Sequence, residues 1–134
     1  MGSMSGKYLG GLRTEDTHHK SGKTVLTDAP TDNNGRGEAF SPTDLVCAAL
    51  SSCMMTLMGI LAEREKIDLS GMTSEITKIM ASNPRRISEI QIVFTHANLK
   101  ASAEQRAKLE HAARTCPVAL SLSESIKQSV TFNF

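Results

Sequence analysis

The sequence predicts an α+β fold with a mostly antiparallel sheet, helices packed on one face of it, and one long, buried, central helix. Three observations support this. Strand-like alternation occurs at both ends of the chain, an apolar stretch with helix start signals lies between them, and an amphipathic helical segment precedes the last strand pattern. The 134 residues have the size of a single domain, 1–134. Residues 1–3 resemble a scar left by an expression tag.

The N-terminal segment is expected to form a hairpin. Residues 7–19, KYLGGLRTEDTHH, begin with a strand pattern that is lost at a polar turn. A turn signal at Ser21-Gly22 precedes a short strand at 24–27. Residues 29–40, APTDNNGRGEAF, are expected to form a loop because they are rich in Pro, Asp, Asn and Gly.

The clearest helix start in the sequence is Ser41-Pro42-Thr43-Asp44. Ser41 suits the N-cap, Pro42 the first helical position and Asp44 the acidic position of a capping box. We expect a helix from there to about Lys66, roughly 35 Å long. It is apolar almost all round, and a monomer of this size would struggle to cover it, which favours a partner subunit.

The apolar stretch at 45–62 is about the minimum length for a membrane span. Four small or polar residues interrupt it: Ser51, Ser52, Thr56 and Gly59. We therefore interpret it as a helix buried inside a soluble protein, with no membrane partner.

The second half of the chain predicts a hairpin, two helices and a final strand. Residues 67–82 and 85–99 alternate on either side of a turn at Asn83-Pro84. Residues 102–116 are amphipathic, with Ser102 as the N-cap, and a short helix follows over 116–122. Residues 127–134 close the chain as a strand.

Charge and composition exclude several classes of function. The formal net charge is +1, no long basic block occurs, and the few aromatic residues give no stacking platform, so we expect no nucleic-acid partner. No signal peptide follows the first residues, and three cysteines without a secretory leader indicate a reducing compartment. The expected location is the cytoplasm.

Two cysteines are candidates for chemistry, and a third, Cys47, is expected to lie in the core. Cys116 precedes Pro117 at a helix start, where backbone N–H groups favour a thiolate and should lower its pKa. Cys53 lies within an apolar helix, where desolvation opposes ionisation, so a reactive Cys53 needs a guanidinium. Arg13 and the pair Arg85-Arg86 are the candidates. The alternative is that both thiols are core fillers, the usual role of a buried cysteine.

The remaining candidates concern ligands. The four histidines show no spacing typical of a zinc site, so no metal and no cofactor are expected. Met54, Met58 and Ile60 are the residues expected to line an apolar, substrate-binding pocket.

The segments SPTDLVCAALSSCMMTLMGI (41–60) and TCPVALSL (115–122) resemble the OsmC/Ohr family, the osmotically inducible and organic hydroperoxide resistance proteins. The resemblance covers nearly the whole chain and is closest to the OsmC-like branch. It implies an intertwined homodimer around two long helices, and a peroxidase without metal or haem. It also implies that Cys53 attacks the peroxide, that Cys116 resolves the sulfenic acid to a disulfide, and that Arg13 stabilises the thiolate.

The sequence departs from the resistance proteins at one position. In those proteins a glutamate near the start of the long helix pairs with the arginine, and Thr43 occupies that place here. Asp44 and Glu38 are the acids available to replace it, and Asp44 is the expected helix cap.

The leading hypothesis is a peroxidase for organic hydroperoxides in oxidative-stress defence, reduced by a dithiol of lipoyl type. The alternative is a non-enzymatic OsmC-like stress protein that binds a small hydrophobic ligand or senses redox state. A third hypothesis is a structural stress protein with unreactive cysteines.

Overall fold

The computed structural model describes residues 2–134 of the chain. It divides into two compact units, Met1–Val46 and Cys47–Phe134, and the long helix begins in the first and continues in the second. Each unit is described by itself below. The mixed α+β fold expected from the sequence is confirmed.

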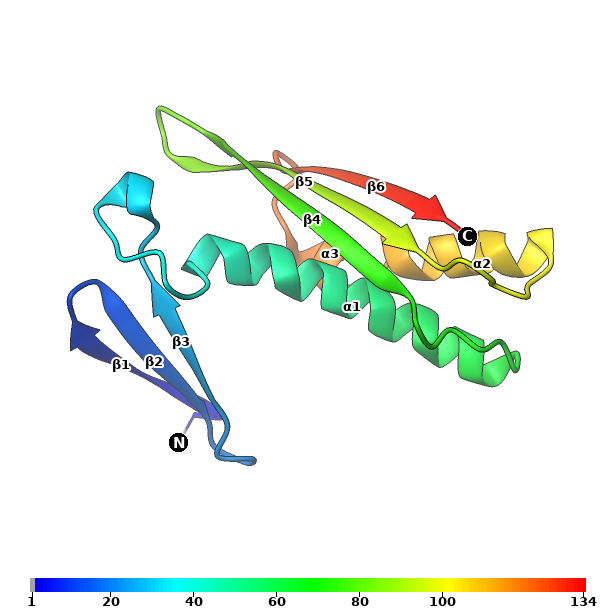
Figure 1. Ribbon diagram of the computed structural model, residues 1–134, viewed down its shortest axis with the longest axis horizontal. Coiled ribbons are helices and arrows are strands. Elements are labelled where there is room, and N and C mark those ends of the chain that lie inside the picture. Colours follow the sequence, from blue (N-terminus) through cyan, green and yellow to red (C-terminus); the bar gives the residue numbers. More distant parts are fainter. Residues whose placement is uncertain (1) are drawn as a thin grey trace. The chain divides into compact units, whose positions relative to one another are not determined.

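The first unit contains an antiparallel sheet of three strands. β1 (Met4–Gly10), β2 (Arg13–His18) and β3 (Thr24–Asp28) lie in that order (Figure 1). The sequence pattern predicts one strand over 7–19 where the structure has two. Gly10, Gly11 and Leu12 all take positive φ (85°, 62° and 63°), and this turn reverses the chain between β1 and β2.

A compact loop follows β3. It contains a 3₁₀ turn, η1 (Thr31–Asn33), and a left-handed residue, Asn34, after it. A Cβ atom added at Gly35 would lie 1.7 Å from the carbonyl oxygen of Ala29, so only glycine fits here without moving the backbone. The loop thus folds back closely on the end of β3.

The long helix, α1 (Pro42–Arg64), begins with the expected capping box. The Ser41 hydroxyl accepts a hydrogen bond from the Asp44 N–H at 3.0 Å, and the Asp44 carboxylate accepts one from the Ser41 N–H at 3.0 Å. These two bonds satisfy backbone donors that have no partner inside the helix. They fix the start of α1 at the residues that the sequence indicated.

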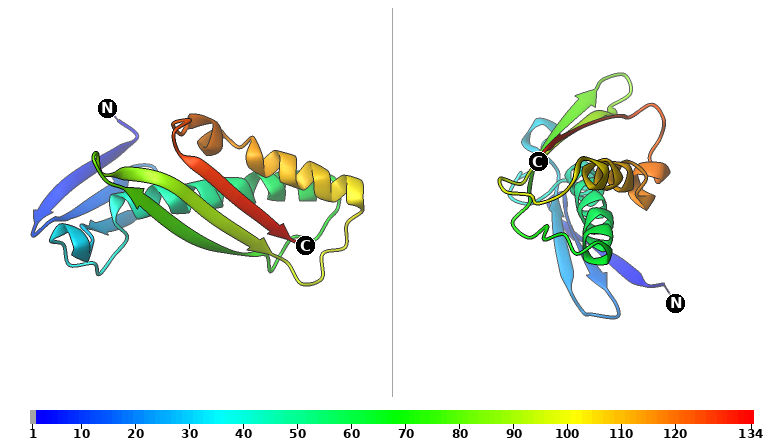
Figure 2. Two further views of the ribbon diagram at one scale, coloured as in Figure 1. Left: turned by 90° about the horizontal axis from the view of Figure 1, so that it is seen from above. Right: turned by 90° about the vertical axis from the view of Figure 1, so that its right-hand side faces the viewer.

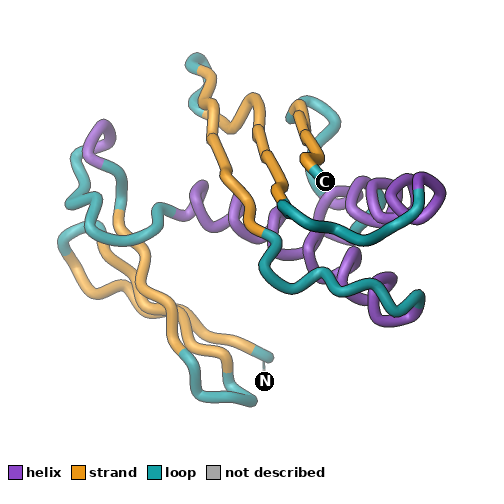
Figure 3. Tube along the Cα trace, turned by 45° about the vertical axis from the view of Figure 1, so that its right-hand side comes forward, coloured by secondary structure: helices purple, strands orange, loops and turns teal. Residues whose placement is uncertain are grey.

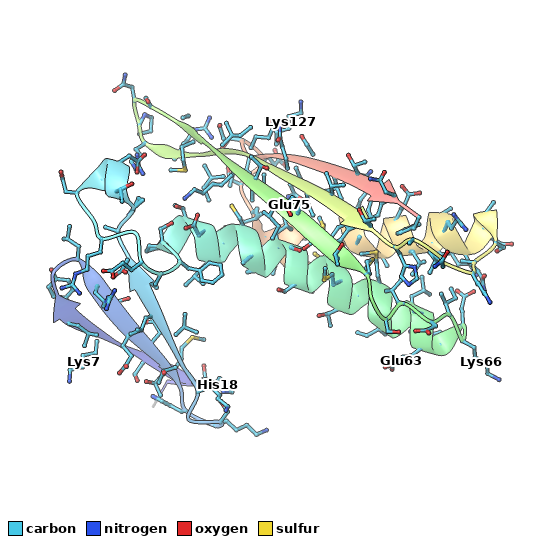
Figure 4. All side chains as sticks on the ribbon, in the orientation of Figure 1. Lys7, His18, Glu63, Lys66, Glu75 and Lys127 are labelled. Carbon is cyan, nitrogen blue, oxygen red and sulfur yellow. The ribbon has the colours of Figure 1, made fainter. Side chains whose placement is uncertain are left out.

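α1 is apolar on more sides than its own chain covers. Its buried positions form one face: Cys47, Leu50, Ser51, Met54, Met58 and Ala62. Among the described residues it is the helix long and apolar enough to cross a membrane, with mean hydropathy 2.1 over an 18-residue window that is 33% buried. The core helix of a soluble protein meets the same criteria. The helix ends among polar residues such as Glu63 (Figure 4).

The second unit contains a mixed three-stranded sheet. β4 (Thr73–Ala81) pairs antiparallel with β5 (Arg86–Thr95), as expected for the hairpin around Asn83-Pro84. β6 (Lys127–Asn133) pairs with β5 in parallel, which differs from a wholly antiparallel sheet. A parallel neighbour requires a crossover connection, and the segment between β5 and β6 supplies it.

That crossover contains α2 (Ala103–Arg114) and α3 (Pro117–Ser121). Ser102 caps α2 in a capping box with Gln105, which confirms the expected N-cap. The helices lie on one face of the β4-β5-β6 sheet (Figures 1 and 2), and Figure 3 shows the strands side by side, with the helices as a separate layer. The fully buried core side chains between these layers are Leu50, Met54, Met58, Ile90, Ile92, Phe94 and Leu109.

Candidate active site

Cys53 lies near the middle of α1, at the border between the buried face of this helix and its exposed side. Its side chain is half-buried, and the neighbouring positions on its face, by helical spacing, are Ala49, Leu57 and Ile60. Ala49 and Ile60 are exposed and Leu57 is half-buried. Cys53 is thus partly exposed, with buried Leu50 and exposed Thr56 also at neighbouring helical positions.

Cys116 is completely buried and is the N-cap residue of α3. Its sulfur accepts a hydrogen bond from the Ala119 N–H, with the nitrogen and sulfur 3.4 Å apart. The helix start expected from Pro117 is therefore present. Its effect on the thiol is outweighed, because burial raises the pKa of Cys116 by more than the Ala119 N–H lowers it. The expected lowering of this pKa is wrong for that reason.

The Cys53 thiol is a close neighbour of Cys116, and its interaction with Cys116, after burial, also raises the pKa of Cys116. The fold therefore brings together two sulfurs that are remote in sequence, one on α1 and one at the start of α3. Both are free thiols in the structure. Cys47, the third free thiol, is buried on the core face of α1.

The three residues expected to bind substrate lie in different environments. Met54 and Met58 are fully buried in the core, whereas the Ile60 side chain is 49% exposed on the face of α1 that carries Cys53. By helical spacing, Ile60 shares a face with Cys53, as do two apolar residues that the sequence analysis did not name, Ala49 and Leu57. Ala49 and Leu57 each lie four residues from Cys53, and this spacing is the signal that would have indicated them.

Arg13, in β2, forms a bidentate ion pair with Asp28 at the end of β3. Arg13 Nε and Nη2 each donate to a carboxylate oxygen of Asp28 at 2.7 Å, and Asp28 is completely buried. Hydrogen bonding to Arg13 is the main reason why the pKa of Asp28 is held below its usual value. The same bonds raise the pKa of Arg13, which stays a cation.

Asp28 directly follows the short strand expected at 24–27 and was not among the acids named from the sequence. Arg13 and Asp28 are directly opposite each other in the β2–β3 register. Fixing that register from the Ser21-Gly22 turn would have placed these residues side by side.

The two acids proposed from the sequence have other contacts. The Glu38 carboxylate lies 3.7 Å from Arg13 Nη2, and the Glu38 N–H donates to Asp28 at 3.2 Å. Asp44 takes part in the capping box of α1. Of the other candidate cations, Arg86 donates to the carbonyl oxygen of Ile87 at 3.1 Å, and Arg85 is exposed near the β4–β5 turn.

Metal ligands were also considered. Within residues 2–134, no three side chains among His, Cys, Asp and Glu form a group that could hold a metal ion.

Known proteins match this chain over most of its length. A family model described as OsmC-like protein matches residues 35–131. A candidate osmotic stress induced and detoxification response protein from Psychrobacter arcticus is 44% identical, with a TM-score of 0.94 over 99% of this chain and 96% of that one. Among proteins with curated descriptions, none matches this sequence.

Two more distant structures share the fold. An organic hydroperoxide resistance protein OsmC from Legionella pneumophila is 18% identical, with a TM-score of 0.73 over 100% of this chain and 98% of that one. A candidate organic hydroperoxide resistance protein from Vibrio cholerae, with captopril in one of its active sites, is 17% identical. Its TM-score is 0.71 over 99% of this chain and 92% of that one.

Proposed function

This chain belongs to the OsmC-like family, and from that premise we propose that it is a thiol peroxidase that reduces organic hydroperoxides. The family includes proteins named for organic hydroperoxide resistance. The single observation that carries the proposal is the contact between the Cys53 and Cys116 thiols. A thiol peroxidase avoids over-oxidation of its reactive sulfur when a second thiol lies close enough to form a disulfide with the sulfenic acid.

In the first step, the thiolate of Cys53 attacks the terminal oxygen of the hydroperoxide. An S–O bond forms while the O–O bond breaks, and the sulfur is oxidised by two electrons to a sulfenic acid. The alkoxide that leaves takes up a proton and becomes an alcohol. Cys53 suits this role because its thiol is the accessible one of the pair.

In the second step, the Cys116 sulfur attacks the sulfur of the Cys53 sulfenic acid. The S–S bond forms, the S–O bond breaks, and the hydroxyl group leaves as water with the proton of the Cys116 thiol. Burial and a raised pKa keep Cys116 protonated until its neighbour is oxidised. The buried sulfur is thereby shielded from direct attack by peroxide.

An external dithiol would then return two electrons to the disulfide and become a disulfide itself. A dithiol of lipoyl type suits this step because it closes to a ring after exchange. The half-buried Cys53 sulfur is the one that such a dithiol would attack first.

We further propose that Arg13 stabilises the Cys53 thiolate, the role implied by the family resemblance. A guanidinium is always charged, and one held by two hydrogen bonds has a fixed direction. Asp28 supplies those bonds in this chain. It would therefore take the place of the glutamate that Thr43 replaces.

The proposed substrate class follows from the apolar surface beside Cys53. Ala49, Leu57 and Ile60 share its helix face. An organic hydroperoxide gains from burying its carbon chain against such a surface, which hydrogen peroxide does not.

The open apolar face of α1 also supports a homodimer. Only 33% of its most apolar window is buried within one chain, and a second copy would cover the remainder. Three free thiols suit a reducing compartment, so we propose the cytoplasm as the location.

Peroxide consumption by three proteins tests the proposal. Purified wild type, Cys53→Ser and Cys47→Ala are mixed with cumene hydroperoxide and dihydrolipoamide. We expect the wild type and Cys47→Ala to consume peroxide at similar rates. Cys53→Ser should fall to the rate of the dithiol alone. Equal consumption by the wild type and Cys53→Ser would contradict the proposal.

Mass spectrometry after peroxide treatment separates the proposal from the ligand-binding alternative. A disulfide between Cys53 and Cys116 lowers the mass by two hydrogens, whereas an unresolved thiol gains oxygen atoms. We expect the first result. A protein that gains oxygen without forming the disulfide would favour the redox-sensing or binding alternative.

A further inference from the structure

Gln128, in β6, faces the helices and reaches the short helix that carries Cys116. In the β5–β6 register it lies beside Ile90, which is completely buried on the core side of the sheet. Its Nε2 donates a hydrogen bond to the carbonyl oxygen of Ala119 at 3.0 Å. Gln128 therefore ties α3 to the sheet.

The same residue, Ala119, holds the Cys116 sulfur through its N–H at 3.4 Å. α3 has only five residues, too few to be stable as an isolated helix. Inside it, the Leu120 N–H donates to the Cys116 carbonyl at 3.1 Å and the Leu122 N–H to the Val118 carbonyl at 3.2 Å. The position of the sulfur therefore depends on how this short turn is docked.

We propose that Gln128 is a positioning residue for the resolving step, because it fixes the turn whose Ala119 N–H contacts the Cys116 sulfur. This inference rests on the proposed function, in which Cys116 resolves the Cys53 sulfenic acid. Among the described residues, Gln128 hydrogen bonds to Ala119 and to neither sulfur, so it acts on Cys116 through Ala119.

The resolving step is sensitive to this placement in two ways. The Cys116 sulfur must line up with the S–O bond of the sulfenic acid while it forms the S–S bond and loses its proton to the departing hydroxyl. Negative charge grows on that sulfur as the proton leaves, and the Ala119 N–H points at it. A loosened α3 weakens both effects. The first step takes place at Cys53 and does not use the Cys116 sulfur, so it is unaffected.

The test is a single-turnover experiment on the full-length protein with Gln128→Met, which keeps the side-chain length and removes the donor. The reduced protein receives one equivalent of cumene hydroperoxide, is quenched by alkylation at intervals, and is analysed by mass. We expect disulfide formation to slow by about threefold to tenfold, the usual effect of one lost hydrogen bond. Formation of the sulfenic acid should stay within about twofold of wild type.

Excess peroxide gives a second readout that a loss of general stability would not produce. A slower resolving step leaves the sulfenic acid open to a second peroxide molecule, which oxidises it to sulfinic acid and releases a further alcohol. Gln128→Met should therefore accumulate sulfinic acid on Cys53 at lower peroxide concentrations than wild type.

Ser129→Ala is the matched control on the same strand. Ser129 Oγ donates to Glu89 Oε2 at 2.6 Å, so this variant also loses one side-chain hydrogen bond, but not the one that holds α3. It should keep both rates. Gln128→Glu is the second variant, and its carboxylate would face the Ala119 carbonyl and slow disulfide formation more than Gln128→Met does at pH 7.

The outcomes are distinct. Wild-type rates of disulfide formation in either folded Gln128 variant would overturn the inference, as would equal slowing in Ser129→Ala. If wild type itself forms no sulfenic acid on Cys53, the proposed function fails instead. If wild type forms the sulfenic acid but no disulfide, the resolving role of Cys116 fails, and with it the role of Gln128.

Discussion

Arg13 and Asp28 face each other across two antiparallel strands and share two hydrogen bonds of 2.7 Å, with the carboxylate completely buried. The Glu38 N–H adds a third bond to Asp28 from the loop after β3. The carboxylate thus has donors on several sides, and the guanidinium plane is fixed by it. The orientation of the Arg13 guanidinium is therefore set by Asp28, within the sheet that contains both residues.

Asp28→Asn should therefore reduce peroxidase activity without touching a thiol. The amide offers one acceptor in place of two, so the guanidinium loses its bidentate geometry. We expect kcat/KM for cumene hydroperoxide to fall by about tenfold to a hundredfold, the usual effect of a misplaced charged group. Asp68→Asn is the control, because the Asp68 carboxylate accepts its hydrogen bonds from the Ser70 N–H and hydroxyl, in the second unit. Unchanged kcat/KM in Asp28→Asn would show that the pair does not serve catalysis.

The same pair predicts an acid-dependent loss of stability. The pKa of Asp28 is lower in the folded protein than in the unfolded chain, chiefly because of its bond to Arg13. Its contribution is therefore complete above the unfolded carboxyl pKa of about 3.9 and is lost as pH falls through the folded value. Urea unfolding should show wild type more stable than Asp28→Asn at pH 7, with the gap closing below about pH 4. A gap independent of pH would contradict this.

Cys116→Ser separates the two chemical steps. Cys53 should still consume its first equivalent of peroxide at a rate within about twofold of wild type, since the buried Cys116 takes no part in the first step. Without the Cys116 thiol the sulfenic acid persists, and a second hydroperoxide molecule oxidises it to sulfinic acid and leaves as a further alcohol. Turnover therefore stops, and the mass rises by two oxygens in total. Continued turnover by Cys116→Ser with dihydrolipoamide would mean that the external dithiol resolves Cys53 directly.

Gly35→Ala tests the loop that supplies the Glu38 N–H to Asp28. The added methyl group would lie 1.7 Å from the Ala29 carbonyl oxygen, so the backbone must shift. We expect the free energy of unfolding to fall by about 1–3 kcal/mol, as for other forced overpacking. Gly59→Ala, in the interior of α1 with open space around it, should instead gain about 0.5–1 kcal/mol. Urea unfolding of both variants gives the comparison, and equal effects would refute the role of the loop contact.

Ile60→Glu tests the proposed homodimer. Ile60 lies on the exposed apolar face of α1, and a carboxylate there would have to be desolvated on association. We expect the dimer dissociation constant, measured by analytical ultracentrifugation, to rise at least about tenfold. Val93→Glu makes the same change at an exposed apolar residue on β5 and should leave the dimer intact. A wild-type protein that sediments as a monomer would remove the homodimer from the proposal.

Elements with local signals could be predicted from the sequence. The capping box at Ser41, the N-cap at Ser102 and the proline after Cys116 each place a helix start within a few residues of chain. The strands on either side of Asn83-Pro84 alternate clearly, and they pair as expected. These features depend on neighbours in sequence.

Features that depend on distant residues were beyond such reasoning. The parallel pairing of β6 with β5 and the partnership of Arg13 with Asp28 are long-range choices. The pKa of Cys116 also depends on both kinds of feature. The sequence indicated the helix start, whose N–H groups lower this pKa, but it did not indicate the burial that raises it by more. The sequence grouped Met54, Met58 and Ile60 as pocket residues, and only packing shows that Met54 and Met58 are buried in the core while Ile60 is exposed.

The crossover between β5 and β6 has a consequence for protein synthesis. During synthesis, α1 and the β4–β5 hairpin leave the ribosome before β6 does. Only the pairing of β6 with β5 then closes the connection that contains Cys116. We expect the nascent chain to carry an unprotected nucleophile during that interval, so peroxide present during translation should damage Cys53 more than the same dose given after release. Equal sulfinylation of Cys53 in ribosome-bound and completed chains would show that the partner thiol arrives earlier than the strand order implies.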